Sequence, residues 1–126
     1  MQTNEIMKQV EELVYKNDTE GFKKLIDSLD DVNIQDKYGW TPLHLAIRRG
    51  REEMLRYLVE EKNADINIQD NSGWTPLMEA IMDDFPSIVK YLVEKGADLS
   101  IANKRGATAP MLAQKFGRTS MYEYLS

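Results

Sequence analysis

The sequence predicts an all-α fold, an α-solenoid in which helix-turn-helix units stack side by side and are joined by extended turns and hairpin loops. The first observation is a repeat: the stretch DKYGWTPLHLAIRRG at Asp36 recurs at Asp70 as DNSGWTPLMEAIMDD, 34 positions later, and a weaker copy begins at Asn103, a further 33 positions along. The second observation is that each full copy carries two apolar stripes at helical spacing. Short helices of this kind cannot bury their apolar faces alone, so neighbouring copies must stack into a shared core.

The first helix of each unit is predicted from its start and stop signals. In the copy at Asp36, a turn around Gly39 leads to Thr41, a good N-cap, and to Pro42, which fits the first helical position because no N–H is needed there. Apolar residues then recur every three or four positions up to Gly50, which ends the helix.

The second helix of this unit is predicted over residues 52–61. Its apolar stripe consists of Met54, Leu55, Leu58 and Val59. The helix is followed by Asn63, where the next unit has Gly96. Both residue types tolerate the left-handed conformation that often ends a helix.

The length of 126 residues fits a single domain. We divide it into an N-terminal cap (3–35), two full repeats (36–69 and 70–102) and a C-terminal cap (103–126). Polar residues replace apolar ones near the ends: Gln114 stands where Ile47 stands in the first full copy, and Lys24 stands where Tyr57 does. Polar outer faces are what terminal units of a repeat array require.

These residues resemble the ankyrin repeat, which has a turn, a Thr-Pro-Leu-His helix start, a second helix and a Gly-Ala-Asp ending. The matching positions are Gly39, Thr41, Pro42, Leu43, His44 and Ala46, then Gly73, Thr75, Pro76, Leu77 and Ala80, then Gly96, Ala97 and Asp98. The sequence departs from the pattern at Met78, which replaces the histidine, and at Ala109-Pro110-Met111 in the last unit. The resemblance implies a non-enzymatic protein–protein interaction module with a concave groove of turn tips and first-helix faces.

Composition excludes several other classes of protein. The chain has no cysteine and one histidine, which rules out disulfides, thiolate zinc sites, cysteine nucleophiles and histidine-rich metal centres. Its net charge of −5 argues against nucleic-acid binding. The N-terminus lacks the pattern of a signal peptide, and no apolar run approaches the roughly 18 residues that a membrane helix needs. We therefore expect a cytoplasmic protein with no cofactor and no metal.

No residue is predicted to be catalytic. The resemblance gives His44 a structural role with Thr41 as its hydrogen-bond partner, and general-base catalysis would also need a nearby nucleophile and orienting group. The paired acidic residues lack the alternating spacing of a calcium loop. Asn33 lies in a context that resembles the asparagine-hydroxylation context of ankyrin proteins; the alternative is that Asn33 and Asn67 shape their loops through bonds to the backbone.

Trp40 and Trp74 are the strongest candidates for partner binding, because tryptophan dominates binding hot spots and both follow the turn glycine. The alternative is that they pack against their own units. The resemblance extends the predicted contact set to Lys37, Tyr38, Trp40, Arg48, Arg49, Asn71, Ser72, Trp74, Met82, Asp83, Lys104, Arg105, Lys115 and Phe116, with Gln35 at its edge.

Within this set Tyr38 joins the two tryptophans as an anchor, while Arg48, Arg49 and Lys37 steer and orient the partner. We therefore expect a partner protein with an acidic patch that faces Lys37, Arg48, Arg49 and Arg105. The alternative is that these cations only keep an exposed groove soluble.

Two further functions stay open. Met121, Tyr122 and Tyr124 could support self-association through an end or the convex face, although we expect a monomer. Docking on an enzyme as a regulatory subunit is a special case of the binding function.

Overall fold

The computed structural model describes residues 2–126, which contain helices and turns but no strand. The chain forms two compact units, Met1–Asp65 (unit 1) and Ile66–Ser126 (unit 2). This all-helical architecture of short helix pairs confirms the predicted fold class.

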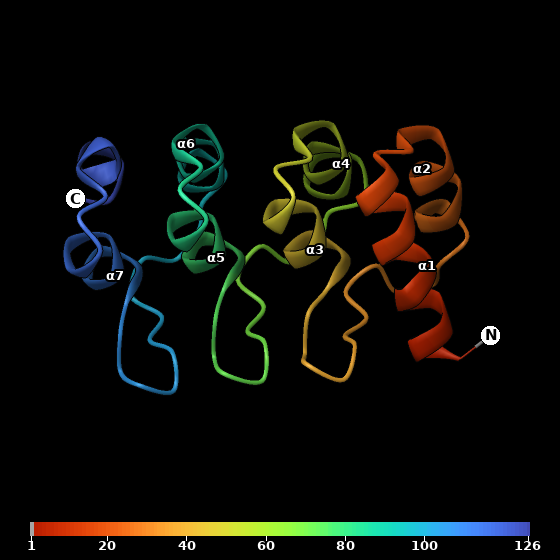
Figure 1. The fold of residues 1–126 in the computed structure, drawn as a ribbon, viewed down its shortest axis with the longest axis horizontal. Helices are drawn as coiled ribbons and strands as arrows, with labels where there is room; N and C mark the ends of the chain where they lie inside the picture. Colours follow the sequence, from red (N-terminus) through yellow and green to blue (C-terminus); the bar gives the residue numbers. More distant parts are fainter. Residues whose placement is uncertain (1) are drawn as a thin grey trace. The chain divides into compact units, whose positions relative to one another are not determined.

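Each unit contains two helix pairs (Figure 1). Unit 1 contains α1 (Thr3–Lys16), α2 (Thr19–Asp27), α3 (Pro42–Arg48) and α4 (Glu52–Arg56), which continues as the π-helical turn η1 (Tyr57–Glu61). Unit 2 contains α5 (Pro76–Met82), α6 (Pro86–Glu94), α7 (Ala109–Lys115) and the 3-10 helix η2 (Thr119–Tyr124). Within each unit the first helices of the two pairs pack together, as do the second helices, so that each unit has two helical layers.

The predicted helix boundaries are confirmed. Thr41 begins α3 and accepts a hydrogen bond from the N–H of His44 at 3.2 Å, while Gly50 follows the helix with a φ of 65°. The predicted second helix over residues 52–61 is α4 together with η1, and its last turn is π-helical. Asn63 and Gly96 both have positive φ, as expected for residues that end a helix.

His44 has the structural role that the resemblance implies. Its side chain is fully buried, and its Nδ1 accepts the N–H of Thr41 at 3.2 Å and lies 2.9 Å from the Thr41 hydroxyl oxygen. These contacts form a capping box that satisfies backbone N–H groups at the start of α3. In unit 2 the equivalent Met78 is also buried, and its side chain contributes apolar packing instead.

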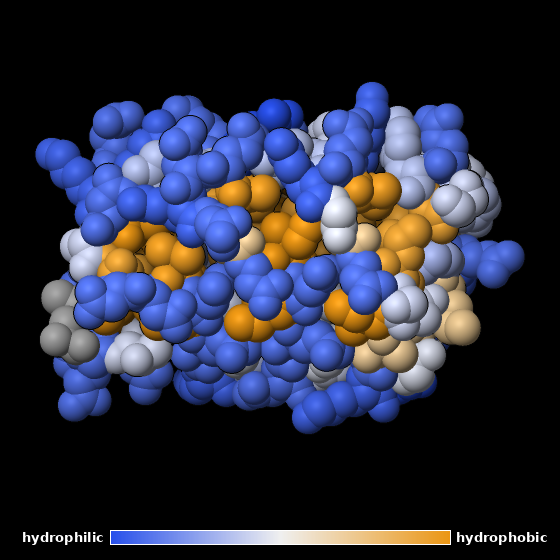
Figure 2. Space-filling view, turned by 180° about the vertical axis from the view of Figure 1, so that it is seen from behind, coloured by the Kyte–Doolittle hydropathy of each residue, from blue (hydrophilic) through white to orange (hydrophobic). Residues whose placement is uncertain are grey.

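The predicted apolar stripes supply the core of the two full repeats, except that Val59 is only half-buried. Residues of α1 and α2 that were not predicted, such as Val10 and Phe22, complete the core of unit 1. Ile47, Met54 and Leu58 are fully buried in unit 1, as are Ile81 and Leu92 in unit 2. Burial is incomplete on the face shown in Figure 2, where hydrophobic residues remain visible between hydrophilic ones. Thin two-layer units leave part of their apolar surface exposed in this way.

Asparagine side chains tie successive loops together inside each unit. Asn33 Oδ1 accepts the N–H of Asp65 at 3.0 Å, and Asn67 Oδ1 accepts the N–H of Asp98 at 2.9 Å. The expectation that these side chains bond to backbone is confirmed, and the bonded backbone belongs to the next repeat, 32 residues along for Asn33 and 31 for Asn67.

Two arginines that were not predicted to have a role cap helix C-termini. Arg51 donates from Nε to the carbonyl of Val14 and from Nη2 to that of Tyr15, at the end of α1. Arg118 makes the same pair of bonds to Ile81 and Met82 at the end of α5. The last carbonyls of a helix lack the usual partner four residues along, so each arginine supplies a donor to two of them. The carbonyls of Val14 and Ile81 also accept a backbone N–H, from Asn17 and Asp84.

Tyr57 forms a polar cluster with Asp27 and Lys62 on unit 1. Its hydroxyl donates to Asp27 Oδ1 at 2.5 Å, and Lys62 Nζ lies 2.8 Å from the same oxygen. The bond to Asp27 raises the pKa of Tyr57 to about 12. Lys62, and then Tyr57, lower the pKa of Asp27.

We expect the ionisation of Tyr57 to be delayed to about pH 12, as measured by the tyrosinate absorbance of the wild type minus that of Tyr57→Phe. Because the folded pKa is raised, this contribution to stability is present below pH 10 and is lost as the pH rises through 12. The Asp27 contribution is present above pH 3.8 and is lost as the pH falls through its lowered folded value. Asp27→Asn should move the Tyr57 midpoint back toward 10, and a wild-type midpoint already near 10 would contradict the prediction.

Candidate binding surface

Aspartate side chains position the predicted anchors. Asp36 Oδ1 accepts the N–H groups of Tyr38 and Trp40, at 2.9 and 3.0 Å. Asp70 Oδ1 does the same for Ser72 and Trp74, both at 2.9 Å. Each carboxylate thus closes a tight hairpin turn and fixes the tryptophan just before the first helix of its repeat.

In unit 1, four predicted contact residues form one aromatic and cationic stack. The Tyr38 and Trp40 rings lie 4.7 Å apart, Arg48 Cζ lies 4.0 Å from the Trp40 ring centre, and Lys37 Nζ lies 5.1 Å from that of Tyr38. We call these four residues the unit 1 stack. Arg49 lies apart from the stack, 5.0 Å from the ring centre of Tyr15.

The unit 1 stack borders a small pocket of about 390 Å³. Its lining consists of Asn4, Met7, Lys8, Glu11, Asp36, Lys37 and Tyr38. The lining carries both signs of charge, and Trp40 is not part of it. Trp40 is half-buried beneath Arg48, so packing accounts for much of its surface.

In unit 2, eight predicted contact residues line one open pocket of about 770 Å³, which we call the unit 2 pocket. They are Asn71, Ser72, Trp74, Met82, Lys104, Arg105, Lys115 and Phe116. Five further lining residues were not predicted: Asn103, Gly106, Ala107, Met111 and Leu112. The predicted Asp83 lies outside this lining, and its Oδ2 is buried without a hydrogen-bond partner among residues 2–126.

The unit 2 pocket combines exposed apolar side chains with uncompensated cations. Met111 is 55% exposed and Phe116 is 43% exposed. Lys104, Arg105 and Lys115 have no carboxylate within 4.0 Å among the residues that the structure describes. The pocket therefore offers an apolar contact and positive charge to the same ligand.

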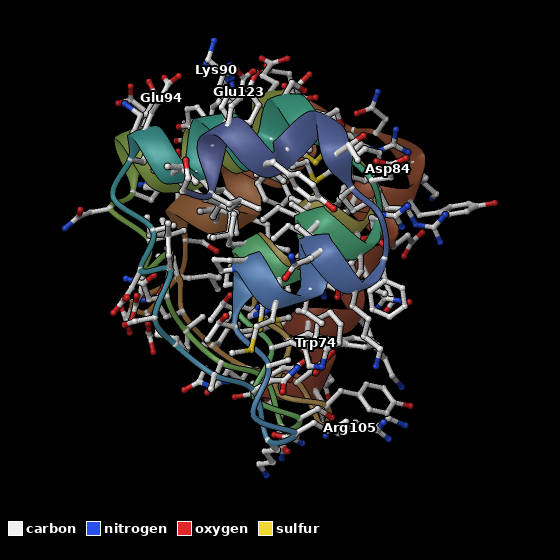
Figure 3. All side chains as sticks on the ribbon, turned by 90° about the vertical axis from the view of Figure 1, so that its left-hand side faces the viewer. Trp74, Asp84, Lys90, Glu94, Arg105 and Glu123 are labelled. Carbon is white, nitrogen blue, oxygen red and sulfur yellow. The ribbon has the colours of Figure 1, made fainter. Side chains whose placement is uncertain are left out.

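Figure 3 shows how charge is distributed over unit 2. Trp74 and Arg105 lie at the hairpin end, whereas Glu94 and Glu123 lie at the far end of the unit. Asp84 lies 4.0 Å from Arg118, and Lys90 lies 4.0 Å from Glu94. The labelled carboxylates are therefore remote from the pocket or already beside a cation.

The apolar C-terminal surface is smaller than predicted. Met121 is fully buried, and Tyr124 is half-buried, because η2 packs against α6 and α7. Tyr122 remains 41% exposed and lines a shallow pocket of about 190 Å³ that includes Pro110 and Leu125. Of the three residues predicted for self-association, only Tyr122 is well exposed.

The described part of the chain contains neither a metal-binding cluster nor a membrane-spanning helix. No group of three or more His, Cys, Asp or Glu residues between positions 2 and 126 is placed to hold a metal ion. Among the same residues, no helix combines the length and apolar character needed to cross a bilayer.

Comparison with known proteins identifies the repeat. A family model described as ankyrin repeats (3 copies) matches residues 11–103. The chain is also 53% identical over 45 residues to protein phosphatase 1 regulatory subunit 12A of Mus musculus, and equally to that of Rattus norvegicus. The aligned stretch is 36% of this chain but only 4% of the length of either relative.

Proposed function

The chain belongs to the ankyrin repeat family, and from this premise we propose that it is a non-catalytic binding protein that holds a partner protein on its hairpin tips and first helices. Ankyrin repeats are protein-interaction modules, so an interaction function follows from the family itself. The surface used, the partner's chemistry and the absence of catalysis are our proposal.

The observation that carries this proposal is the unit 2 pocket. Hairpin residues such as Trp74 and first-helix residues such as Met111 line it together, which is the combination of elements that the groove requires. The unit 1 stack supplies a second contact surface built from the same repeat positions. Binding is passive, because hairpins already fixed by Asp36 and Asp70 lose little conformational entropy when a partner docks.

A regulatory role is the second candidate function. The segment similar to a protein phosphatase 1 regulatory subunit favours docking on an enzyme as one form of partner binding. We further propose that the chain is a monomer with a partner that carries an acidic patch, and its cytoplasmic location stays a prediction from the sequence.

We expect Trp74→Ala to weaken partner binding about tenfold or more, and Trp40→Ala to weaken it less. The reason is that Trp74 lines an open pocket, whereas Trp40 is partly covered by Arg48. The partner would be identified by affinity purification and mass spectrometry, and the affinity of the purified pair would then be measured by calorimetry.

Tyr122→Ala is the matched control, because this exposed aromatic side chain lies outside both proposed contact surfaces. Circular dichroism would establish that each variant keeps its helical fold. If both tryptophan variants fold and bind as tightly as the wild type, the assignment of the groove is wrong. A larger loss with Tyr122→Ala would favour binding through the end instead.

A further inference from the structure

The two candidate surfaces differ in what their cations contact. In unit 1, Arg48, Lys37 and Arg49 each lie over an aromatic ring of the same unit, at 4.0 to 5.1 Å. In unit 2, Arg105 and Lys104 have neither an aromatic ring contact nor a carboxylate within 4.0 Å among the described residues. Among the predicted contact residues, the cations with neither kind of contact therefore lie at the unit 2 pocket, although Lys8 and Lys24 of unit 1 also lack an ion pair among the described residues.

The size and apolar lining of the unit 2 pocket suit a short peptide segment. At about 770 Å³ it falls within the range of ligand-binding pockets and is larger than a single side chain needs. Trp74, Met82, Met111, Leu112 and Phe116 provide an apolar wall. Methionine side chains adapt to a bulky apolar group, and tryptophan is a frequent hot-spot residue in pockets that exclude water.

The pocket is preformed on its hairpin side. The backbone N–H of Lys104 donates to the carbonyl of Ser72 at 3.0 Å, which joins the hairpins over residues 69–74 and 102–107 directly. Gln69 Nε2 adds bonds to the carbonyls of Gly73 and Ala102, at 2.9 and 3.1 Å. A ligand that enters between these hairpins and α7 therefore meets a fixed surface and orders little of the chain on binding.

We propose that the unit 2 pocket binds a segment of the partner protein in which one large apolar side chain is flanked by Asp or Glu residues. The apolar side chain packs against Trp74 and Phe116, and the flanking carboxylates pair with Lys104, Arg105 and Lys115. This inference rests on the proposed function and adds the chemistry of the bound segment and the unit that holds it. It also makes Trp74 the principal anchor, while Trp40 acts mainly as the platform for Arg48.

A defined peptide provides the test. The probe has a central phenylalanine with several glutamates on each side and blocked ends, and it is titrated into the whole chain in a calorimeter. We expect saturable binding that weakens as salt is added, because exposed ion pairs are screened. A peptide with lysines in place of the glutamates should not bind, and one with alanine in place of the phenylalanine should bind about tenfold more weakly.

Protein variants assign the peptide to the pocket. Trp74→Ala should reduce peptide affinity about tenfold, and Arg105→Glu, at an exposed position that leaves the core intact, should reduce it several-fold. The control is Lys24→Glu, a charge reversal at an exposed position of α2 in unit 1, which should leave the affinity unchanged. If Lys24→Glu lowers the peptide affinity as much as Arg105→Glu does, the effect comes from the net charge of the protein alone, and the proposed site is overturned.

The failure of this inference can be distinguished from failure of the proposed function. If the acidic peptide does not bind at millimolar concentration, or binds no better than its lysine counterpart, the inference is overturned. The proposed function still stands in that case if the identified partner loses affinity with Trp74→Ala or Trp40→Ala. If the partner is indifferent to both substitutions, the groove itself is not the binding surface.

Discussion

Replacing Gly73 with alanine is expected to lower the free energy of unfolding by about 3 kcal/mol, measured by chemical denaturation. Gly73 has a φ of +83°, which an alanine adopts at a cost of about 1 kcal/mol. A Cβ at this position would also lie 2.8 Å from the backbone nitrogen of Lys104 and 2.9 Å from Asn103 Cα. Backbone atoms cannot rotate away as the end of a side chain can, so one hairpin must move.

Gly106→Ala is the matched control. It lies 33 positions after Gly73, at the same place in its hairpin, and its φ of +82° is almost the same. A Cβ added to Gly106 has no neighbour within 4 Å, so this variant should lose only the conformational part, about 1 kcal/mol. The difference in free energy of unfolding between the two variants measures the cost of pushing the two hairpins apart. If both variants lose the same stability, the hairpins separate without cost.

The same substitution should affect binding. Gly73 lies between Ser72 and Trp74, which both line the unit 2 pocket, so a displaced hairpin would move Trp74 out of position. Gly73→Ala should therefore lower the affinity for the acidic peptide at least as much as Trp74→Ala does. A folded Gly73→Ala protein that binds the peptide normally would show that hairpin spacing does not shape the site.

The fold could be predicted from the sequence because its determinants are local and repeated. Thr41 and Thr75 each mark a helix start, and the glycines that follow the hairpin turn have the positive φ that only glycine adopts readily. Each signal occurs twice at the same spacing, which fixes the register of the helices. The π-helical end of the α4 helix has no such signal, and sequence reasoning did not predict it.

The unit 2 pocket could be predicted in part, because its residues occupy corresponding repeat positions. Asn71, Ser72 and Trp74 follow directly from alignment with the first full copy. Met111 was missed because its aligned positions, His44 and Met78, are buried, whereas Met111 is 55% exposed. Exposure depends on which helices pack over a residue and not on its position in the repeat.

The contacts of the cations could not be predicted at all. Alignment places Arg48 near the binding surface, but whether it faces solvent or stacks on Trp40 depends on its rotamer and on the position of the ring. Arg51 and Arg118 could have been found, because each follows the glycine that ends a first helix, at Gly50 and Gly117. An arginine at that point can reach the carbonyls of a helix in the preceding repeat, which is the role both play.

Arg118→Met is expected to lower the free energy of unfolding by about 2 kcal/mol. The guanidinium donates to the carbonyls of Ile81 and Met82 at 3.0 and 2.9 Å, and its side chain is only 25% exposed. Methionine keeps much of the apolar volume but leaves two carbonyls at the end of α5 without these donors. The loss is measured by denaturant unfolding monitored by circular dichroism.

Arg105→Met is the control for replacing an arginine that makes no carbonyl bonds with methionine. Arg105 is exposed and its side chain has no ion pair among the described residues, so its replacement should change stability by less than about 0.5 kcal/mol. If the two methionine variants lose the same amount, Arg118 does not stabilise unit 2 through its carbonyl bonds.

Arg118→Lys separates the geometry of the side chain from its charge. Lysine keeps a positive charge near the negative end of the α5 dipole, but its single ammonium group cannot reproduce the two parallel bonds of the guanidinium. We therefore expect Arg118→Lys to be less stable than the wild type but more stable than Arg118→Met. The corresponding substitutions of Arg51 should have the same effects, because Arg51 makes the same two bonds to the carbonyls of Val14 and Tyr15. Full recovery by lysine would mean that the helix dipole, and not the pair of carbonyl bonds, is what this arginine stabilises.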